Sequence, residues 1–289
     1  MTVVRIFTAS VLIPVVVAVV WLAPTSVVAV LAAAVILFAL LEFFTLGDLA
    51  GLRGYRAWTG FCALAIFFMQ WLSSAEQSLG IAASGRAGRI PEAAEAFSVE
   101  LILIIFVVGS TAIILFGKRP VDESLGGLSV SAAAMLFLVL PFSAVVRLHG
   151  AGSEGRKLLL FTLALVWAGD TLAYFVGRAV GRRKMAPLLS PKKTWAGAAA
   201  NLSGSILVAV VAQRWLKIPI HDLILMAALA NVAGQAGDLL ESAYKRSAGS
   251  KDSGTILPGH GGMLDRIDAL VLAAPVVWYY FSWIVDRSA

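Results

Sequence analysis

Long apolar stretches separated by short polar connections make up most of the chain. A helix needs about 20 mostly apolar residues to cross a bilayer, or about 17 at the short end. Nine stretches meet or nearly meet this length, and we expect a membrane-spanning helix in each of them: 6–22, 27–46, 57–73, 101–116, 129–147, 157–177, 195–212, 221–237 and 267–285. The pattern therefore predicts an all-α fold, a polytopic transmembrane helical bundle of about nine spans.

The first apolar stretch has one feature of a secretory signal, because Arg5 precedes it. It continues past Pro24 into the next apolar stretch without a convincing cleavage site. We therefore expect it to be retained as a helix.

Composition supports a membrane protein and excludes two other classes. Of the 289 residues, 60% are hydrophobic and 14% are charged, against about 25% charged in soluble domains. The single cysteine, Cys62, lies inside an apolar stretch, which excludes disulfides and thiolate metal sites. Basic loops beside anionic headgroups explain most of the net charge of +6. There is no soluble basic domain, so we expect no nucleic-acid partner.

The distribution of lysine and arginine predicts the orientation, because cytoplasmic loops carry an excess of both. With nine spans, 15 of the 23 basic residues fall on the side of the N-terminus, and ten of these lie in only two loops. We expect the N-terminus to be cytoplasmic and the C-terminus to lie outside.

Polar residues divide the chain into two parts. We expect residues 1–150 to form a scaffold of transmembrane helices and to supply the contacts of any homodimer. Residues 151–289 carry two polar segments, 167–197 and 234–268, both on the predicted cytoplasmic side. We expect these segments to meet in a catalytic region. The longest connection, 74–100, is expected to hold a short amphipathic helix without chemistry.

The first polar segment contains an aspartate inside a span and a basic loop after it. Asp170 within a helix of the membrane costs about 2.5 kcal/mol or more, so it either fastens two helices or contacts a cation or substrate. Ser190 and Pro191 predict a helix start, with Ser190 as the N-cap. Lys192 and Lys193 would then oppose the helix dipole unless an anion binds there. The alternative is an ordinary basic cytoplasmic loop.

The second polar segment gathers acidic residues. If 237–246 is helical, Asp238, Glu241 and Lys245 share one face. Asp265 and Asp268 are three residues apart at the start of the last span, where acidic residues also occur simply to complement the dipole. Carboxylates beside phosphate-binding cations are typical of a Mg²⁺ site.

A glycine-rich stretch, Leu-Pro-Gly-His-Gly-Gly, lies between these carboxylates. It allows tight turns and close approach of the backbone to a ligand. Its histidine, His260, is interpreted as a hydrogen-bonding residue of the turn or as a general base.

These residues together resemble the phosphatidate cytidylyltransferase family, which makes CDP-diacylglycerol. The family's C-terminal signature matches, with every spacing kept, at Ser242, Lys245-Arg246, Lys251-Asp252, His260-Gly261-Gly262, Asp265-Arg266 and Asp268. Asp170-Thr171 and the segment 190–195 also resemble family segments. Two positions depart from the pattern: Ala196 replaces a usual glutamate, and Tyr244 replaces a smaller apolar residue.

The resemblance implies that the phosphate of phosphatidic acid attacks the α-phosphorus of CTP and releases pyrophosphate. A phosphate monoester is largely ionised at neutral pH, with a second pKa of about 6, so the nucleophile needs no general base. The enzyme must supply positioning and charge neutralisation. The expected partners are CTP, phosphatidic acid and membrane lipids.

The resemblance also suggests roles for individual residues. Asp238 and Asp265 are expected to bind Mg²⁺, with Asp268 as a further ligand or the partner of one, and a second divalent ion of unknown identity is compatible with this set. Asp265, Asp238 and Lys245 form the expected catalytic group. The residues expected to bind substrate are Arg246, Lys251, Arg266, Lys192, Lys193, Ser190, His260 and Asp170.

Two other functions remain open from the sequence. A CTP-dependent polyprenol or lipid kinase would activate an alcohol and move the γ-phosphate instead. A secondary transporter would also have intramembrane carboxylates, but corresponding broken spans in two halves are expected in that class and none is seen. The expected location is a bacterial inner membrane, with the active site facing the cytoplasm.

Overall fold

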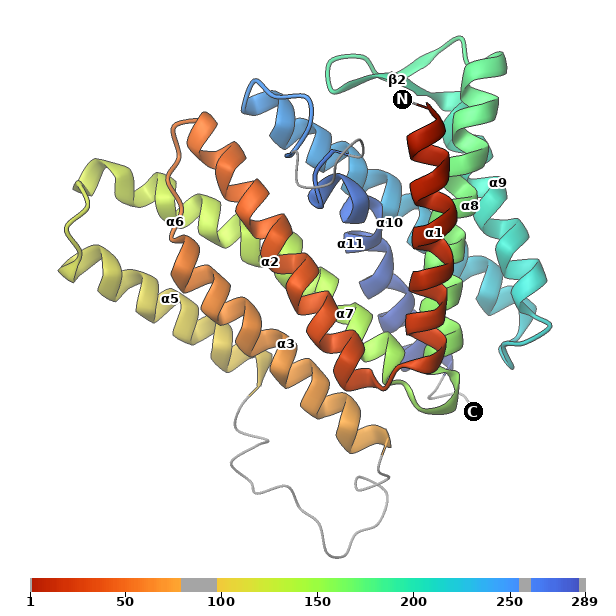
Figure 1. The fold of residues 1–289 in the computed structure, drawn as a ribbon, viewed down its shortest axis with the longest axis horizontal. Coiled ribbons are helices and arrows are strands. Elements are labelled where there is room, and N and C mark those ends of the chain that lie inside the picture. Colours follow the sequence, from red (N-terminus) through yellow and green to blue (C-terminus); the bar gives the residue numbers. More distant parts are fainter. Residues whose placement is uncertain (1, 79–97, 255–260, 286–289) are drawn as a thin grey trace, which may run out of the picture.

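The apolar stretches form long helices in the computed structural model, which describes residues 2–78, 98–254 and 261–285 (Figure 1). The helices are α1 (Thr2–Leu22), α2 (Thr25–Leu49), α3 (Arg56–Ser78), α5 (Val99–Phe116), α6 (Ser124–Ala133), α7 (Leu140–His149), α8 (Gly155–Val180), α9 (Trp195–Ala212), α10 (Ile220–Ser247) and α11 (Leu264–Tyr280). Four short segments accompany them: the 3₁₀ turns η1 (Val121–Glu123) and η3 (Gly152–Glu154), and the π-helical segments η2 (Ala134–Val139) and η4 (Phe281–Val285).

The all-α membrane bundle is confirmed. Within the described residues, eight helices are long and apolar enough to cross a membrane, and one of them runs through α6, η2 and α7. The apolar part of α1, Ser10–Leu22, is shorter, so the ninth span stays a prediction. Large apolar side chains such as Phe61 and Phe116 are 62% and 86% exposed, as expected for surfaces that face lipid. The amphipathic helix expected in 74–100 falls mainly on 79–97, outside the described part.

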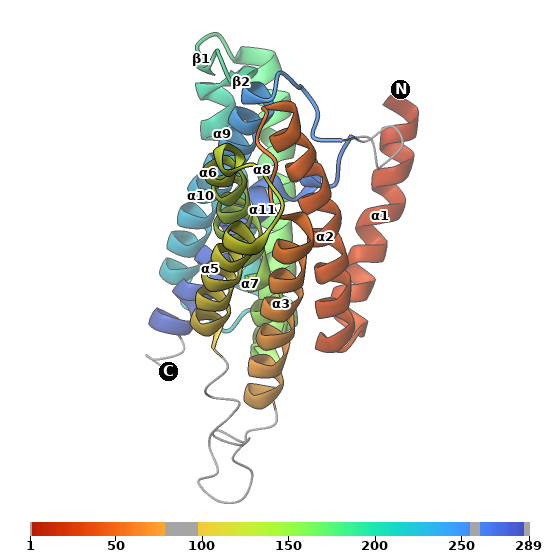
Figure 2. The same cartoon turned by 90° about the vertical axis from the view of Figure 1, so that its left-hand side faces the viewer.

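The helices run up and down between two ends of the molecule (Figures 1 and 2). One end carries the start of α1, the C-terminal end of α10 and the two strands, and we call it the hairpin end. The start of α8 and the connection from α9 to α10 lie at the opposite end. The two polar segments predicted to carry the chemistry both approach the hairpin end.

The predicted helix start at Ser190 is wrong. Residues Ser190–Thr194 form strand β2, which pairs antiparallel with β1 (Lys184–Ala186). Helix α9 begins only at Trp195, because the Thr194 hydroxyl accepts the Gly197 N–H at 3.1 Å and caps the helix. Pairing between the two strands outweighs the local Ser-Pro signal, so Lys192 and Lys193 extend from a strand and not from the first turn of a helix.

Glycines bring α10 and α11 into close contact. A Cβ atom added at Gly237 would lie 2.6 Å from the backbone oxygen of Asp268, and one at Gly234 would lie 3.2 Å from that of Ala269. Small residues let helix backbones approach closely. Helices in a bilayer depend on such packing, because lipid is as apolar as the helix surfaces and no hydrophobic effect drives them together. This contact places the acidic residues of the two helices side by side.

The same device joins α8 to α9. A Cβ atom at Gly169 would lie 2.0 Å from Asn201 Oδ1, and one at Gly177 would lie 3.5 Å from Gly197 Cα. The three helices α8, α9 and α10 therefore hold their polar residues within a narrow space.

The orientation can be tested by cysteine labelling. We expect Leu188→Cys, which is 91% exposed in the hairpin, to react with a membrane-impermeant maleimide in inside-out vesicles only. Ser153→Cys, exposed at the opposite end, should react in right-side-out vesicles only. Native Cys62 is 1% exposed and should stay unlabelled in both. The reverse pattern would contradict the predicted cytoplasmic hairpin end.

The helix contact at Gly237 predicts a loss of stability on substitution. Gly237→Ala should lower the free energy of unfolding in mixed micelles by about 1–3 kcal/mol, because the methyl group meets backbone. The matched control is Gly60→Ala in α3, where a Cβ atom would have only an ordinary contact of 3.7 Å. This control should be neutral or slightly stabilising. Equal stability of the two variants would rule out a close contact at Gly237.

Candidate active site

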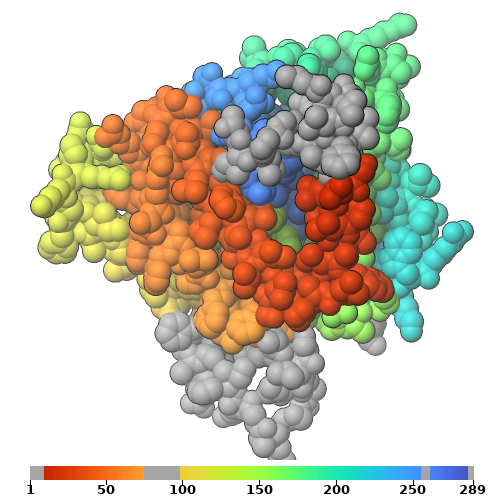
Figure 3. Space-filling view, viewed as in Figure 1, coloured from red at the N-terminus to blue at the C-terminus, as the bar shows by residue number. Residues whose placement is uncertain are grey.

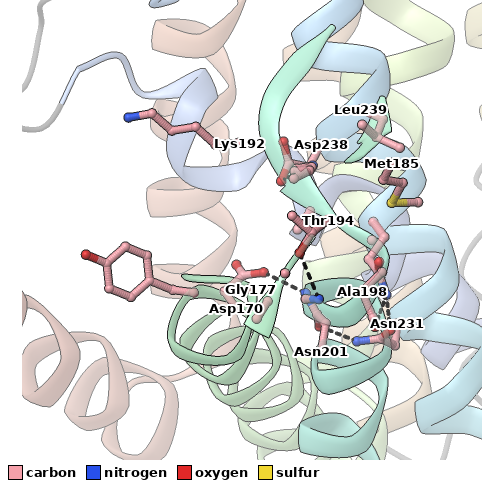
Figure 4. Close-up of a pocket in the computed structure, with 18 of the residues that line it drawn as sticks. Asp170, Gly177, Met185, Lys192, Thr194, Ala198, Asn201, Asn231, Asp238 and Leu239 are labelled. Atoms are coloured by element: carbon pink, nitrogen blue, oxygen red, sulfur yellow. Dashed lines mark hydrogen bonds and ion pairs between the residues drawn. The ribbon is translucent and has the colours of Figure 1, made fainter. Parts of the chain in front are cut away.

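A cavity of 660 Å³ opens between α8, the hairpin, α9 and α10 (Figure 4). Charged residues line it toward the hairpin, among them Lys192, Lys193 and Asp238. Apolar residues of the spans, including Leu165 and Ala230, line it as well. The cavity thus joins a charged region to an apolar region between the long helices.

Three carboxylates gather beside this cavity. Asp238, Glu241 and Asp268 each offer one oxygen atom, and these atoms lie within 4.8 Å of one another. Asp238 and Glu241 are three residues apart on α10, and the glycine contact brings Asp268 of α11 against them. Three hard oxygen donors fit Mg²⁺, which binds carboxylates and completes its shell with water and phosphate oxygens.

An ion pair joins the hairpin to this carboxylate group. Lys193 Nζ lies 2.5 Å from Asp238 Oδ2, and both side chains are partly exposed. The two polar segments of the sequence therefore meet at one place, although two spans separate them along the chain. Lys192 is exposed and points away from Asp238 (Figure 4).

Asp265 has a different set of contacts from the three grouped carboxylates. Its Oδ1 lies 2.5 Å from Lys245 Nζ, which also lies 2.5 Å from Glu241 Oε2. Its Oδ2 accepts the N–H groups of Ser253 and Gly262 at 3.1 and 2.9 Å. Lys245 thus connects Asp265 to the carboxylate group.

The other predicted substrate-binding residues are more dispersed. Arg246 donates to the backbone oxygens of Leu189 and Ser250 at 3.1 and 3.0 Å, which ties α10 to the hairpin loop. Lys251 and Arg266 are exposed at the hairpin end, and Ser190 is half-buried at the start of β2. His260 lies outside the described residues.

Asp170 is hydrogen-bonded to a series of polar side chains on α9 and α10, and the sequence analysis did not predict this series. Asn201 Nδ2 donates to Asp170 Oδ1 at 3.1 Å, and Asn231 Nδ2 donates to Asn201 Oδ1 at 2.5 Å. Gln235 Nε2 donates to Asn231 Oδ1 at 2.6 Å, and Ser205 Oγ accepts from Asn231 at 2.6 Å. The structure shows the first interpretation of Asp170, since the residue fastens α8 to α9. Asp170 also lines the cavity, and its contact with a cation or substrate stays a prediction.

Glu42 of α2 is a second residue that sequence reasoning missed. Its side chain is 4% exposed, and its carboxylate accepts from Ser253 Oγ, Met263 N and Leu264 N at 2.9, 2.9 and 2.8 Å. The sequence did contain an indication of a role for Glu42, because a glutamate inside an apolar stretch is as unusual as an aspartate such as Asp170. These contacts join the N-terminal part of the chain, residues 1–150, to the C-terminal part, residues 151–289. The division of the chain at residue 150 stays a prediction.

Tyr244, which departs from the family pattern, has a clear packing role. Its ring makes edge contacts with Phe43 of α2 and Phe137 of η2, with centroids 5.3 and 5.4 Å apart. Tyr244 therefore fixes α10 against the N-terminal helices beside Glu42. The structure gives no reason for Ala196 at the other departure.

Comparisons with known proteins show which family the chain resembles in sequence. The sequence model of the cytidylyltransferase family matches residues 3–284. The phosphatidate cytidylyltransferase of Brucella abortus (strain 2308) is 40% identical over 186 residues, which cover 62% of this chain and 65% of that protein. The matched region is thus just under two thirds of that relative's length.

Two further relatives of the same name show similar agreement. The Staphylococcus epidermidis (strain ATCC 12228) protein is 45% identical over 127 residues, covering 43% of this chain and 49% of that protein. The Bacillus subtilis protein is 32% identical over 185 residues, covering 63% and 68%. Because the family model matches residues 3–284, nearly the whole chain, this chain belongs to the cytidylyltransferase family.

Proposed function

We propose that this protein transfers the cytidylyl group of CTP to phosphatidic acid, giving CDP-diacylglycerol and pyrophosphate. The observation that carries the proposal is the contact between Lys193 and Asp238, which both line the cavity. It joins a cationic hairpin to three grouped carboxylates at a place where a cavity also extends into an apolar region between the long helices. The shared name of the curated relatives supports the same reaction.

The cavity suits one polar and one lipid substrate. Lys192, Lys193 and Arg178 offer positive charge to phosphates near the hairpin, and apolar residues such as Leu165 and Val166 line the cavity within the span of α8. A lipid phosphate at the membrane surface and a nucleotide from water would meet between these regions. Holding both reactants in line removes much of the entropic barrier to their reaction.

The proposed ligands of Mg²⁺ are Asp238, Glu241 and Asp268. Asp265 is a fourth proposed ligand, and its Oδ1 would bind the ion while it still contacts Lys245. When bound, a divalent ion neutralises charge that develops on the transferring phosphoryl group.

The chemical step needs charge and alignment more than proton transfer. An ionised phosphate oxygen of phosphatidic acid attacks the α-phosphorus, and the bond from that phosphorus to the pyrophosphate oxygen breaks. Lys193 and Lys245 would hold the reacting phosphates, and Arg246, Lys251 and Arg266 lie at the same end to attract the triphosphate. The ionised nucleophile makes a general base unnecessary.

The location and assembly follow from the same proposal. CTP dissolves in the cytoplasm, so the hairpin end would face the cytoplasmic side of a bacterial inner membrane. Residues 1–150 remain our proposal for the contacts of a homodimer.

Product analysis tests the reaction directly. We expect purified protein in micelles with phosphatidic acid, Mg²⁺ and labelled CTP to produce CDP-lipid and pyrophosphate in equal amounts. Chelation of the metal should stop turnover, and added Mg²⁺ should restore it. CDP together with a newly phosphorylated lipid would indicate a kinase, and unconsumed CTP in an otherwise folded protein would point to transport.

Substitution of the proposed ligands gives a second test. Asp238→Asn and Asp265→Asn should each lower turnover by at least about 100-fold, because each removes a charge that the site uses to hold cations. Asp122→Asn is the matched control, since Asp122 is exposed on η1 and does not line the cavity, and it should keep wild-type turnover. Full activity in either site variant would remove that residue from the active site.

A further inference from the structure

Glu42 is a buried carboxylate far from the predicted site in sequence but adjacent to it in space. It lies on α2, more than 200 residues before Ser253 and Leu264. Figure 3 shows the orange surface of α2 and the blue surface of the end of α10 next to each other at the hairpin end. The edge contact between Phe43 and Tyr244 holds the same two helices together.

Both carboxylate oxygens of Glu42 accept hydrogen bonds. Oε1 accepts from Met263 N, and Oε2 accepts from Leu264 N and from the Ser253 hydroxyl. Its partners among the described residues are backbone N–H groups at the start of α11 and one hydroxyl. A negative charge at a helix N-terminus is stabilised by the helix dipole and satisfies N–H groups that have no partner within the helix.

The chain packs around this carboxylate without space for side chains. A Cβ atom at Gly254 would lie 2.6 Å from Glu42 Oε1, and one at Gly262 would lie 2.3 Å from Oε2. Glu42 thus contacts the chain on both sides of residues 255–260. These contacts fix the positions of Ser253 and of the first turn of α11.

A series of contacts leads from Glu42 to the charged groups of the site. The Ser253 hydroxyl lies 2.9 Å from Glu42 Oε2 and 3.0 Å from Asp265 Oδ2. Asp265 in turn holds Lys245 by its other oxygen. The position of the Lys245 ammonium group therefore depends, through two residues, on a carboxylate of the N-terminal half.

We infer that Glu42 is a positioning residue that orients Asp265 and Lys245 by fixing Ser253 and the first turn of α11 from helix α2. The inference rests on the proposed function, because the readout is transfer of the cytidylyl group. Glu42 does not line the cavity, so it acts on the reaction through these residues and not on the substrate.

Glu42→Gln tests the inference while keeping the size of the side chain. The amide NH₂ group of the glutamine would occupy one of the two oxygen positions, where it would face a donor. At least one hydrogen bond is therefore lost. We expect kcat to fall by about 100-fold, the size of effect that a misplacement of about 1 Å has on a positioned group. KM for CTP should change by less than about threefold, because Arg246 and Lys251, which are proposed to attract the triphosphate, make no contact with Glu42.

Two further variants separate positioning from folding. Asp48→Asn is the matched control on α2, because Asp48 is 42% exposed and pairs with Arg56 away from the site, and it should keep wild-type kcat. Ser253→Ala removes the link between Glu42 and Asp265 and should lower kcat even where Glu42→Gln does not fold. The double variant Glu42→Gln/Ser253→Ala should be no slower than the slower single variant. Both substitutions break the same connection, which runs from Glu42 through Ser253 to Asp265.

The outcomes distinguish this inference from the proposed function. Wild-type protein that makes no CDP-lipid would overturn the function and the inference together. Active wild-type protein with unchanged kcat in folded Glu42→Gln, or in Ser253→Ala, would overturn the inference alone. Independent, multiplying losses in the double variant would also defeat it.

Discussion

The close contact of α10 and α11 is the constraint on which the site depends. Gly237 allows the backbone of α10 to approach that of Asp268, and no larger residue fits there without moving one helix. Asp238, Glu241 and Asp268 come together because of this contact. Gathering three carboxylates beside a membrane is unfavourable unless cations compensate them, and Lys193 and Lys245 lie at 2.5 Å from members of the group.

The membrane explains how the polar residues are arranged. Polar groups in a span must find partners within the protein, because lipid offers none. Asp170, Asn201, Asn231 and Gln235 satisfy one another across three helices and line the cavity at the same time. The residues that stabilise the bundle are therefore also those that a substrate entering the cavity would meet.

The N-terminal helices take part in this arrangement. Glu42 caps α11, and Phe43 packs on Tyr244, so α2 positions both helices that carry the carboxylates. The proposed function, which joins a water-soluble nucleotide to a lipid, would require charged groups to be held in fixed positions. Contacts with a helix from the other half of the chain hold Ser253 and the first turn of α11 in place.

The sequence by itself determined the membrane bundle and the family, because apolar length and the spacing of charged residues are local properties. The shared face of Asp238, Glu241 and Lys245 followed from helical periodicity alone. Only the tertiary structure decided that Ser190 begins a strand, since strand pairing with Lys184–Ala186 outweighs a local capping signal. It also decided that Glu241 joins Asp238 and Asp268, that Asp265 is held by Lys245, and that Glu42 reaches α11. These contacts join residues far apart in the chain, and the approach distance between helices that creates them depends on packing at glycines, which no single stretch of sequence specifies.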